Sequence, residues 1–311
     1  SRQKRQCRAL ASEELYEEME DDTAMAHRVK ARSTTDLVLR VLREAHEPLT
    51  VEEILSRVQK LAPVHSANPK NTMRKAISQM FLVQSTDDGR FGYLPYLLAD
   101  NRFRHPIEQG ALMRQSFLLG PELVIALWPS TFEITKRRDE SPALLHLQGW
   151  DGAEAVRIYR EVEGWGFQAD PGFWSWLESM DPHTGDELIF SVLDADERRY
   201  DVRMTGRAER DEARIAERNK QIADLSEALL KVAHDAVILS NVAVRLIGQG
   251  AYRDPVPPDP LAVVLDQDPR FVNAGLDMVA LADRWPGYPT EPVDVRRWIG
   301  TTVSTVGREE E

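Results

Sequence analysis

Apolar residues recur every three or four positions in three successive segments between residues 33 and 80. This spacing is typical of amphipathic α-helices that bury one face. The three apolar faces are Leu37, Val38, Val41, Leu42 and Ala45; Val51, Ile54, Leu55, Val58 and Leu61; and Met73, Ala76, Ile77 and Met80. A helix-capping signal precedes each segment: Ser33 or Thr34, then a Thr50/Glu53 capping box, then Asn68 followed by Pro69.

A β-hairpin is predicted directly after the third helix. Residues 81–86 and 90–94 have strand character, and Asp87-Asp88-Gly89 between them supplies the positive φ that a tight turn requires. Three helices followed by a hairpin give the element order of a winged helix-turn-helix. We therefore predict a winged helix over about residues 33–95, within a domain of residues 33–98.

Five short motifs lie within this segment: Leu42-Arg43-Glu44-Ala45, Pro48-Leu49, Glu53-Ile54, Asn68-Pro69-Lys70-Asn71-Thr72 and Gly89-Arg90-Phe91-Gly92-Tyr93-Leu94. With these motifs the segment resembles the HARE-type helix-turn-helix domain of chromatin and restriction proteins. The resemblance covers about a fifth of the chain and implies a DNA-linked or regulatory role.

The third helix has a polar face opposite its apolar one, and this face is the candidate DNA contact. Such side chains contact phosphates and base edges in nucleic-acid complexes. The predicted DNA-binding residues are Lys70, Asn71, Arg74, Lys75, Ser78 and, on the wing, Arg90. Residues 33–98 hold eight basic and seven acidic residues, and Asp87 and Asp88 at the wing tip would repel phosphate. A solvated helix surface, or a winged-helix scaffold that binds proteins, therefore remains an alternative.

Strand patterns dominate residues 99–206, which we interpret as a small antiparallel sheet or barrel. Strands are predicted at 123–128 and from Val156 onward, and a hairpin joins 187–193 to 199–204. Asp170-Pro171 begins a short helix between them. Five aromatic residues favour a core over a base-stacking platform: Trp165, Phe167, Phe173, Trp174 and Trp176.

A long helix is predicted in the C-terminal part, residues 207–311. Apolar residues step by three and four from Ile222 to Leu246, a seam of more than three heptads. Flanking positions are apolar too, which indicates burial within the chain or at a dimer interface. We expect a homodimer through residues 222–246, with intramolecular burial as the alternative.

A second, degenerate winged helix is predicted after Pro257-Pro258. A short apolar helix at 261–265 is followed by a hairpin that includes Arg270-Phe271. This helix lacks Lys and Arg, so protein contact is a better expectation for it than DNA. The fold class that follows from all three parts is α+β.

Composition narrows the function classes. The net charge of −12 argues against non-specific coating of nucleic acid, and the single Cys7 excludes an internal disulfide. None of the seven histidines pairs at metal-ligand spacing, and Asp181, His183 and Asp186 fit an ordinary turn. With no catalytic motif visible, we expect no cofactor, no metal and no enzymatic activity; an unrecognised enzyme is the third alternative. Residues 1–32 form a charged leader without a secretory signal, and no stretch suits a bilayer, so a cytoplasmic DNA-binding regulator is the leading hypothesis.

Overall fold

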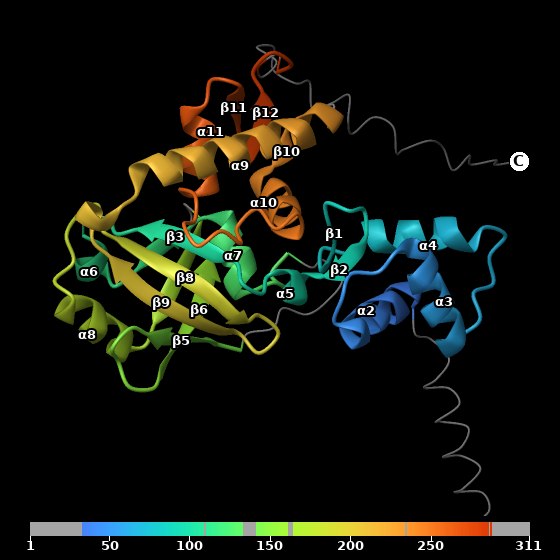
Figure 1. The fold of residues 1–311 in the computed structure, drawn as a ribbon, viewed down its shortest axis with the longest axis horizontal. Coiled ribbons are helices and arrows are strands. Elements are labelled where there is room, and N and C mark those ends of the chain that lie inside the picture. Colours follow the sequence, from blue (N-terminus) through green and yellow to red (C-terminus); the bar gives the residue numbers. More distant parts are fainter. Residues whose placement is uncertain are drawn as a thin grey trace, which may run out of the picture.

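The structure is a computed structural model that describes residues 33–108, 110–132, 141–160, 164–233, 235–285 and 287. Helices and strands are mixed along the chain, so the predicted α+β class is confirmed (Figure 1). The charged leader with Cys7 and residues 288–311 lie outside the described residues.

The N-terminal unit, residues 33–98, contains three helices, a hairpin and a final short helix. These elements are α2 (Thr34–Ala45), α3 (Val51–Leu61), α4 (Pro69–Ser78), β1 (Val83–Ser85), β2 (Phe91–Tyr93) and α5 (Leu94–Leu97). The predicted caps are present: Ser33, Thr50 and Asn68 each accept a hydrogen bond from a backbone N–H of the first turn. Glu53 completes the capping box by accepting from the Thr50 backbone N–H at 2.8 Å.

The connection between α2 and α3 joins the hairpin as a third, one-residue strand. Leu49 and Phe91 exchange two backbone hydrogen bonds, of 2.9 and 2.8 Å. Ile54 and Ile77 are buried as predicted, whereas Leu55 and Phe91 are half-buried. Leu61 is 41% exposed, so its assignment to the buried face is wrong. It is the last residue of α3 and is not among the residues that this helix buries.

The sheet unit, residues 99–206, holds a curved sheet of seven strands among the described residues (Figure 1). The strands are β3 (Arg102–Pro106), β4 (Phe117–Leu119), β5 (Ala143–Leu147), β6 (Ala153–Arg160), β7 (Trp165–Ala169), β8 (Glu187–Asp194) and β9 (Arg199–Thr205). Their order is β3-β8-β9-β5-β6-β7-β4, and only the β5–β9 pair is parallel. The predicted β8–β9 hairpin and the strand at Val156 are confirmed.

Three short helices cover this sheet: α6 (Ala111–Arg114), α7 (Pro121–Leu127) and α8 (Pro171–Ser179). The strand predicted at 123–128 is wrong, because these residues form most of α7. Glu122 to Leu127 are all buried. A helix that is buried on every side shows no periodicity, so a short apolar run does not distinguish it from a buried strand.

The C-terminal unit, residues 207–285, repeats the helix and strand order of the N-terminal unit. Its elements are η2 (Arg207–Glu209), α9 (Glu212–Val232), β10 (Val237–Ile238), α10 (Leu239–Gly248), α11 (Leu261–Gln267), β11 (Phe271–Gly275) and β12 (Met278–Leu281). The three strands pair antiparallel in the order β10-β12-β11.

The apolar seam of residues 222–246 is not one helix. The helix α9 ends at Val232, Ala233 has an extended backbone, and β10 pairs with β12 before α10 begins at Leu239. The β-branched Val237 and Ile238 suit this strand. Each helix buries its own set of residues within the chain, including Ile222 and Leu230 on α9 and Val244 and Leu246 on α10.

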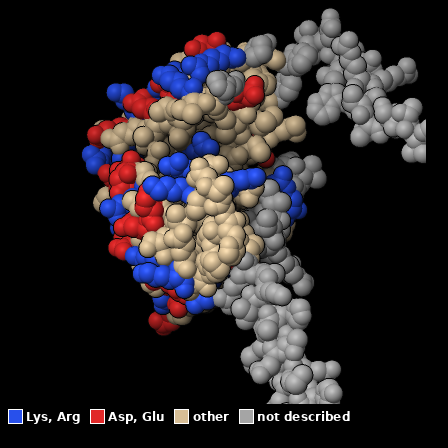
Figure 2. All heavy atoms as spheres, turned by 90° about the vertical axis from the view of Figure 1, so that its right-hand side faces the viewer, with Lys and Arg blue, Asp and Glu red and all other residues tan. Residues whose placement is uncertain are grey.

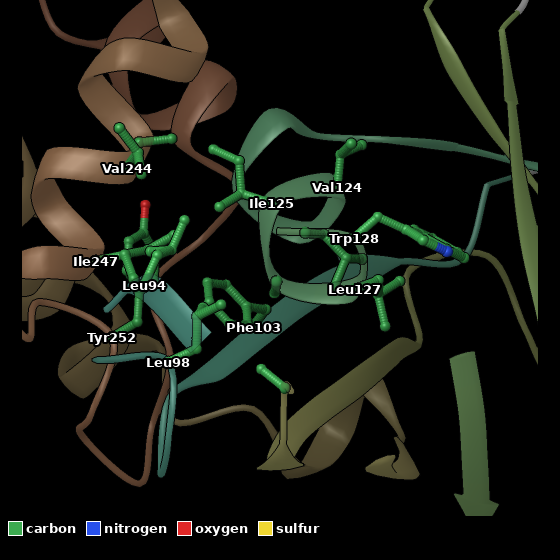
Figure 3. Close-up of a cluster of buried hydrophobic side chains, with 14 of the residues drawn as sticks. Leu94, Leu98, Phe103, Val124, Ile125, Leu127, Trp128, Val244, Ile247 and Tyr252 are labelled. Atoms are coloured by element: carbon green, nitrogen blue, oxygen red, sulfur yellow. The ribbon is translucent and has the colours of Figure 1, made fainter. Parts of the chain in front are cut away.

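One hydrophobic core joins the three units. Figure 3 shows Val244, Ile247 and Tyr252 of the C-terminal unit gathered with Leu94 and Leu98 of the N-terminal unit and Phe103 of β3, beside α7. A buried ionic cluster adds to this junction. Glu187 on β8 forms ion pairs with both Arg104 and Arg210, and Arg210 also contacts Asp259 at 3.1 Å. The three units are therefore packed as one body.

Candidate nucleic-acid interface

The polar face of α4 is exposed as predicted. The buried side chains Met73, Ala76 and Ile77 fix the rotation of the helix against α2 and α3. All five predicted contact residues on α4 consequently face solvent: Lys70, Asn71, Arg74, Lys75 and Ser78.

The charges on this face differ in their local partners. Lys70 lies 2.8 Å from Glu52 on α3, and its hydrogen bond holds the pKa of Glu52 below the usual range. Arg74 and Lys75 make no ion pair with any residue that the structure describes. Ser78 donates its hydroxyl to the Lys75 carbonyl at 3.0 Å. The two unpaired cations are therefore the strongest candidates for phosphate contact on α4.

Arg90 lies on the hairpin and is already neutralised. Its guanidinium lies 3.2 Å from Asp88. The Thr86 hydroxyl and the Arg90 backbone N–H also donate to Asp88, and the pKa of this carboxyl is lowered. An arginine held by a neighbouring carboxylate is a weaker phosphate ligand than a free one, so the structure favours α4 over the wing.

Most other cations of the N-terminal unit are paired as well. Arg40 pairs with Glu44, Arg57 with Glu47, and Arg43 with Asp196 of the sheet unit. Among the described cations of this unit, those without an ion pair are Lys60, Arg74 and Lys75. Figure 2 shows the end of the molecule that carries this unit, where Lys and Arg are interspersed with Asp and Glu.

The sequence did not show that α10 packs beside β1, near the C-terminal end of α4. A groove runs between the end of α4, strand β1 and the helix α10, and Asn241 and Arg245 of α10 line it together with Ser78. Nothing in the local pattern of α10 predicts this, because the contact joins segments more than 150 residues apart. The signal available in the sequence was that Ser240, Asn241 and Arg245 interrupt an otherwise apolar segment, the last two at a spacing of four residues.

The other candidate sites have structural roles. Asp186 accepts backbone hydrogen bonds from His183 at 2.7 Å and Arg207 at 2.8 Å, which keeps its pKa low and fixes the turn before β8. The described residues contain no group of three His, Cys, Asp or Glu side chains that could hold a metal. Trp174 and Trp176 are 3% and 1% exposed, so the predicted core role of the aromatic cluster is confirmed.

Comparison with known proteins gives no family. No protein-family model matches the chain. No curated protein matches it either. The HARE resemblance therefore stays an interpretation of the residues themselves. Among the described helices, none is both long and apolar enough to cross a membrane.

Proposed function

We propose that this chain is a cytoplasmic DNA-binding regulator that contacts duplex DNA through α4. The exposed face of α4 carries the proposal: its Asn, Arg, Lys and Ser side chains are all exposed, and neither Arg74 nor Lys75 has a described carboxylate within ion-pair distance. The helix presents hydrogen-bond donors that suit base edges and phosphates.

The arrangement of the N-terminal unit supports its interpretation as a winged helix. The order is α2, the Leu49 bridge, α3, α4 and the β1–β2 hairpin, with α4 in the place of the recognition helix. The C-terminal unit has the same order in α9, β10, α10, α11, β11 and β12. We propose that it is a second winged helix.

The direct test is a gel-shift assay with a random duplex pool. We expect the full chain to retard duplex DNA and the Arg74→Ala/Lys75→Ala double variant to retard it far less. Arg114→Ala/Lys220→Ala is the matched control, because it removes one exposed Arg and one exposed Lys away from α4. Equal retardation by both double variants would remove α4 from the interface.

A second candidate function is protein binding without DNA. The exposed residues of α11 favour it: Ala262, Val263, Asp266 and Gln267 include no cation. The carboxylates Asp87 and Asp88 at the tip of the first hairpin are exposed too. A chain that retards no duplex at low salt would favour this second function.

A further inference from the structure

The groove between the N-terminal and C-terminal units has an unusual charge composition. Its walls come from the end of α4, from β1, and from α10 with β10. No Asp or Glu is among the described residues that line it, although the chain has 51 acidic residues and a net charge of −12. Among the described residues that line the groove, Arg245 is the one that carries a charge.

Neutral hydrogen-bonding side chains surround Arg245. These are Ser78, Gln79, Gln84, Ser85, Ser240, Asn241 and Gln249. Half-buried Phe81 and Ile238, which is 48% exposed, add apolar surface to the groove. A single cation among neutral donors and apolar patches is complementary to a sugar-phosphate backbone, which combines anionic oxygens with deoxyribose rings.

The groove continues the exposed face of α4. Residues four apart lie on the same face of a helix, one turn from each other. Ser78 therefore lies one turn beyond Arg74, and Gln79 one turn beyond Lys75, at the groove rim. Asn241 and Arg245 are four apart as well, and both are exposed on α10. The polar face of α4 therefore ends, at Ser78 and Gln79, on the rim of the groove that also holds Arg245.

The position of α10 is fixed by packing. Ile247, on the opposite side of α10, is buried in the junction core of Figure 3, and Val244 is buried between that core and the groove. Gly248 approaches the hairpin so closely that a Cβ there would lie 2.7 Å from the Ser85 carbonyl oxygen. Such packing fixes α10, and with it the backbone of Arg245, against the hairpin strand β1, and a preorganised contact loses little entropy on binding.

We infer that duplex DNA bound at α4 extends into this groove, and that Arg245 contacts a backbone phosphate there. Asn241 and Gln79 donate hydrogen bonds to the same strand. This inference rests on the proposed function and deepens it. The C-terminal unit contacts no base edges in this arrangement, but it adds a phosphate contact to those of the first winged helix.

The test measures duplex affinity of the full chain by fluorescence anisotropy at several salt concentrations. The variants are Arg245→Ala, Asn241→Asp and Arg74→Ala/Lys75→Ala, with Lys220→Ala as the control for loss of one exposed charge outside the groove. We expect Arg245→Ala to weaken binding about fivefold and to reduce the slope of log affinity against log salt by about one. Asn241→Asp should weaken binding too, because it places a carboxylate beside the phosphate.

The outcomes separate this inference from the proposed function. If Arg245→Ala and Asn241→Asp bind duplex DNA like wild type while the α4 double variant binds weakly, the inferred DNA contact in the groove is wrong and the proposed α4 interface is supported. If only the groove variants bind duplex DNA weakly, the proposed α4 interface is wrong and the groove is a separate DNA contact. A wild-type chain that binds no duplex overturns both.

Discussion

At the scale of single residues, burial decides the chemistry of His105. This residue lies on β3, is 4% exposed, and packs edge-on against Phe117 with ring centroids 5.0 Å apart. Burial lowers the pKa of its imidazole to about 4, because the core does not solvate the charged form.

The lowered pKa predicts a pH-dependent stability. Between about pH 6.5 and about pH 4, His105 is protonated in the unfolded chain but stays neutral in the folded chain. Stability is therefore present above pH 6.5 and is lost as the pH falls. Relative to His105→Leu, the wild-type free energy of unfolding should fall by up to about 1.4 kcal/mol per pH unit in this window. Urea melts across the window measure it, and parallel curves for the two proteins would contradict the prediction.

Residue-level signals in the sequence were informative where the chemistry is local. The caps at Ser33, Thr50 and Asn68 were predictable because each acts on N–H groups three residues away. In β9, buried Tyr200 and Val202 alternate with exposed Arg199, Asp201 and Arg203, which is the two-residue period of a strand with one buried side. The unpaired state of Arg74 was not predictable, since it depends on which carboxylates the fold brings near.

At the scale of elements, the stability of the N-terminal unit rests on the apolar face of α4. Ile77 is 4% exposed and belongs to the hydrophobic core. We expect Ile77→Ala to reduce the free energy of unfolding by roughly 2–5 kcal/mol, through lost transfer energy and the cavity left behind. Chemical denaturation of the full chain measures this, and Ser78→Ala on the exposed face is the control. A loss below about 0.5 kcal/mol for Ile77→Ala would show that α4 is not packed as described.

Element prediction failed where burial is complete or the chain reverses. The helix α7 is buried on all sides, so its sequence lacks the periodicity that identifies a helix. The seam of residues 222–246 kept its spacing across the break after Val232, because the strand β10 contributes apolar residues of its own. A regular spacing of apolar residues along the sequence can continue across a break in the helix, so it does not show where the backbone changes direction.

At the scale of the whole molecule, the apolar surface of residues 222–246 is covered largely by the chain itself. Leu225 and Val232 remain 37% and 78% exposed on α9. We retain the proposal of a homodimer with twofold symmetry, the commonest form of assembly, with these residues at the interface. Light scattering should give the mass of two chains for the wild type and the mass of one chain for Val232→Glu. A single-chain mass for the wild type would rule the dimer out.

The arrangement of the three units could not be predicted from the sequence. Glu187, Arg104 and Arg210 are separated along the chain by more than 20 residues each, yet they form one buried ionic cluster. The same long-range packing places α10 beside β1, near the end of α4. The candidate site on α4 was predictable from one segment, whereas its extension depends on the complete fold.

The central claim is that α4 binds the DNA backbone, and salt dependence tests it most directly. Duplex affinity is measured for wild type and for Arg74→Ala/Lys75→Ala across a range of salt concentrations. The account predicts that wild-type affinity falls linearly with log salt and that the double variant has a slope smaller by about one to two. An unchanged slope in the double variant, or a wild-type affinity that does not respond to salt, would contradict the account.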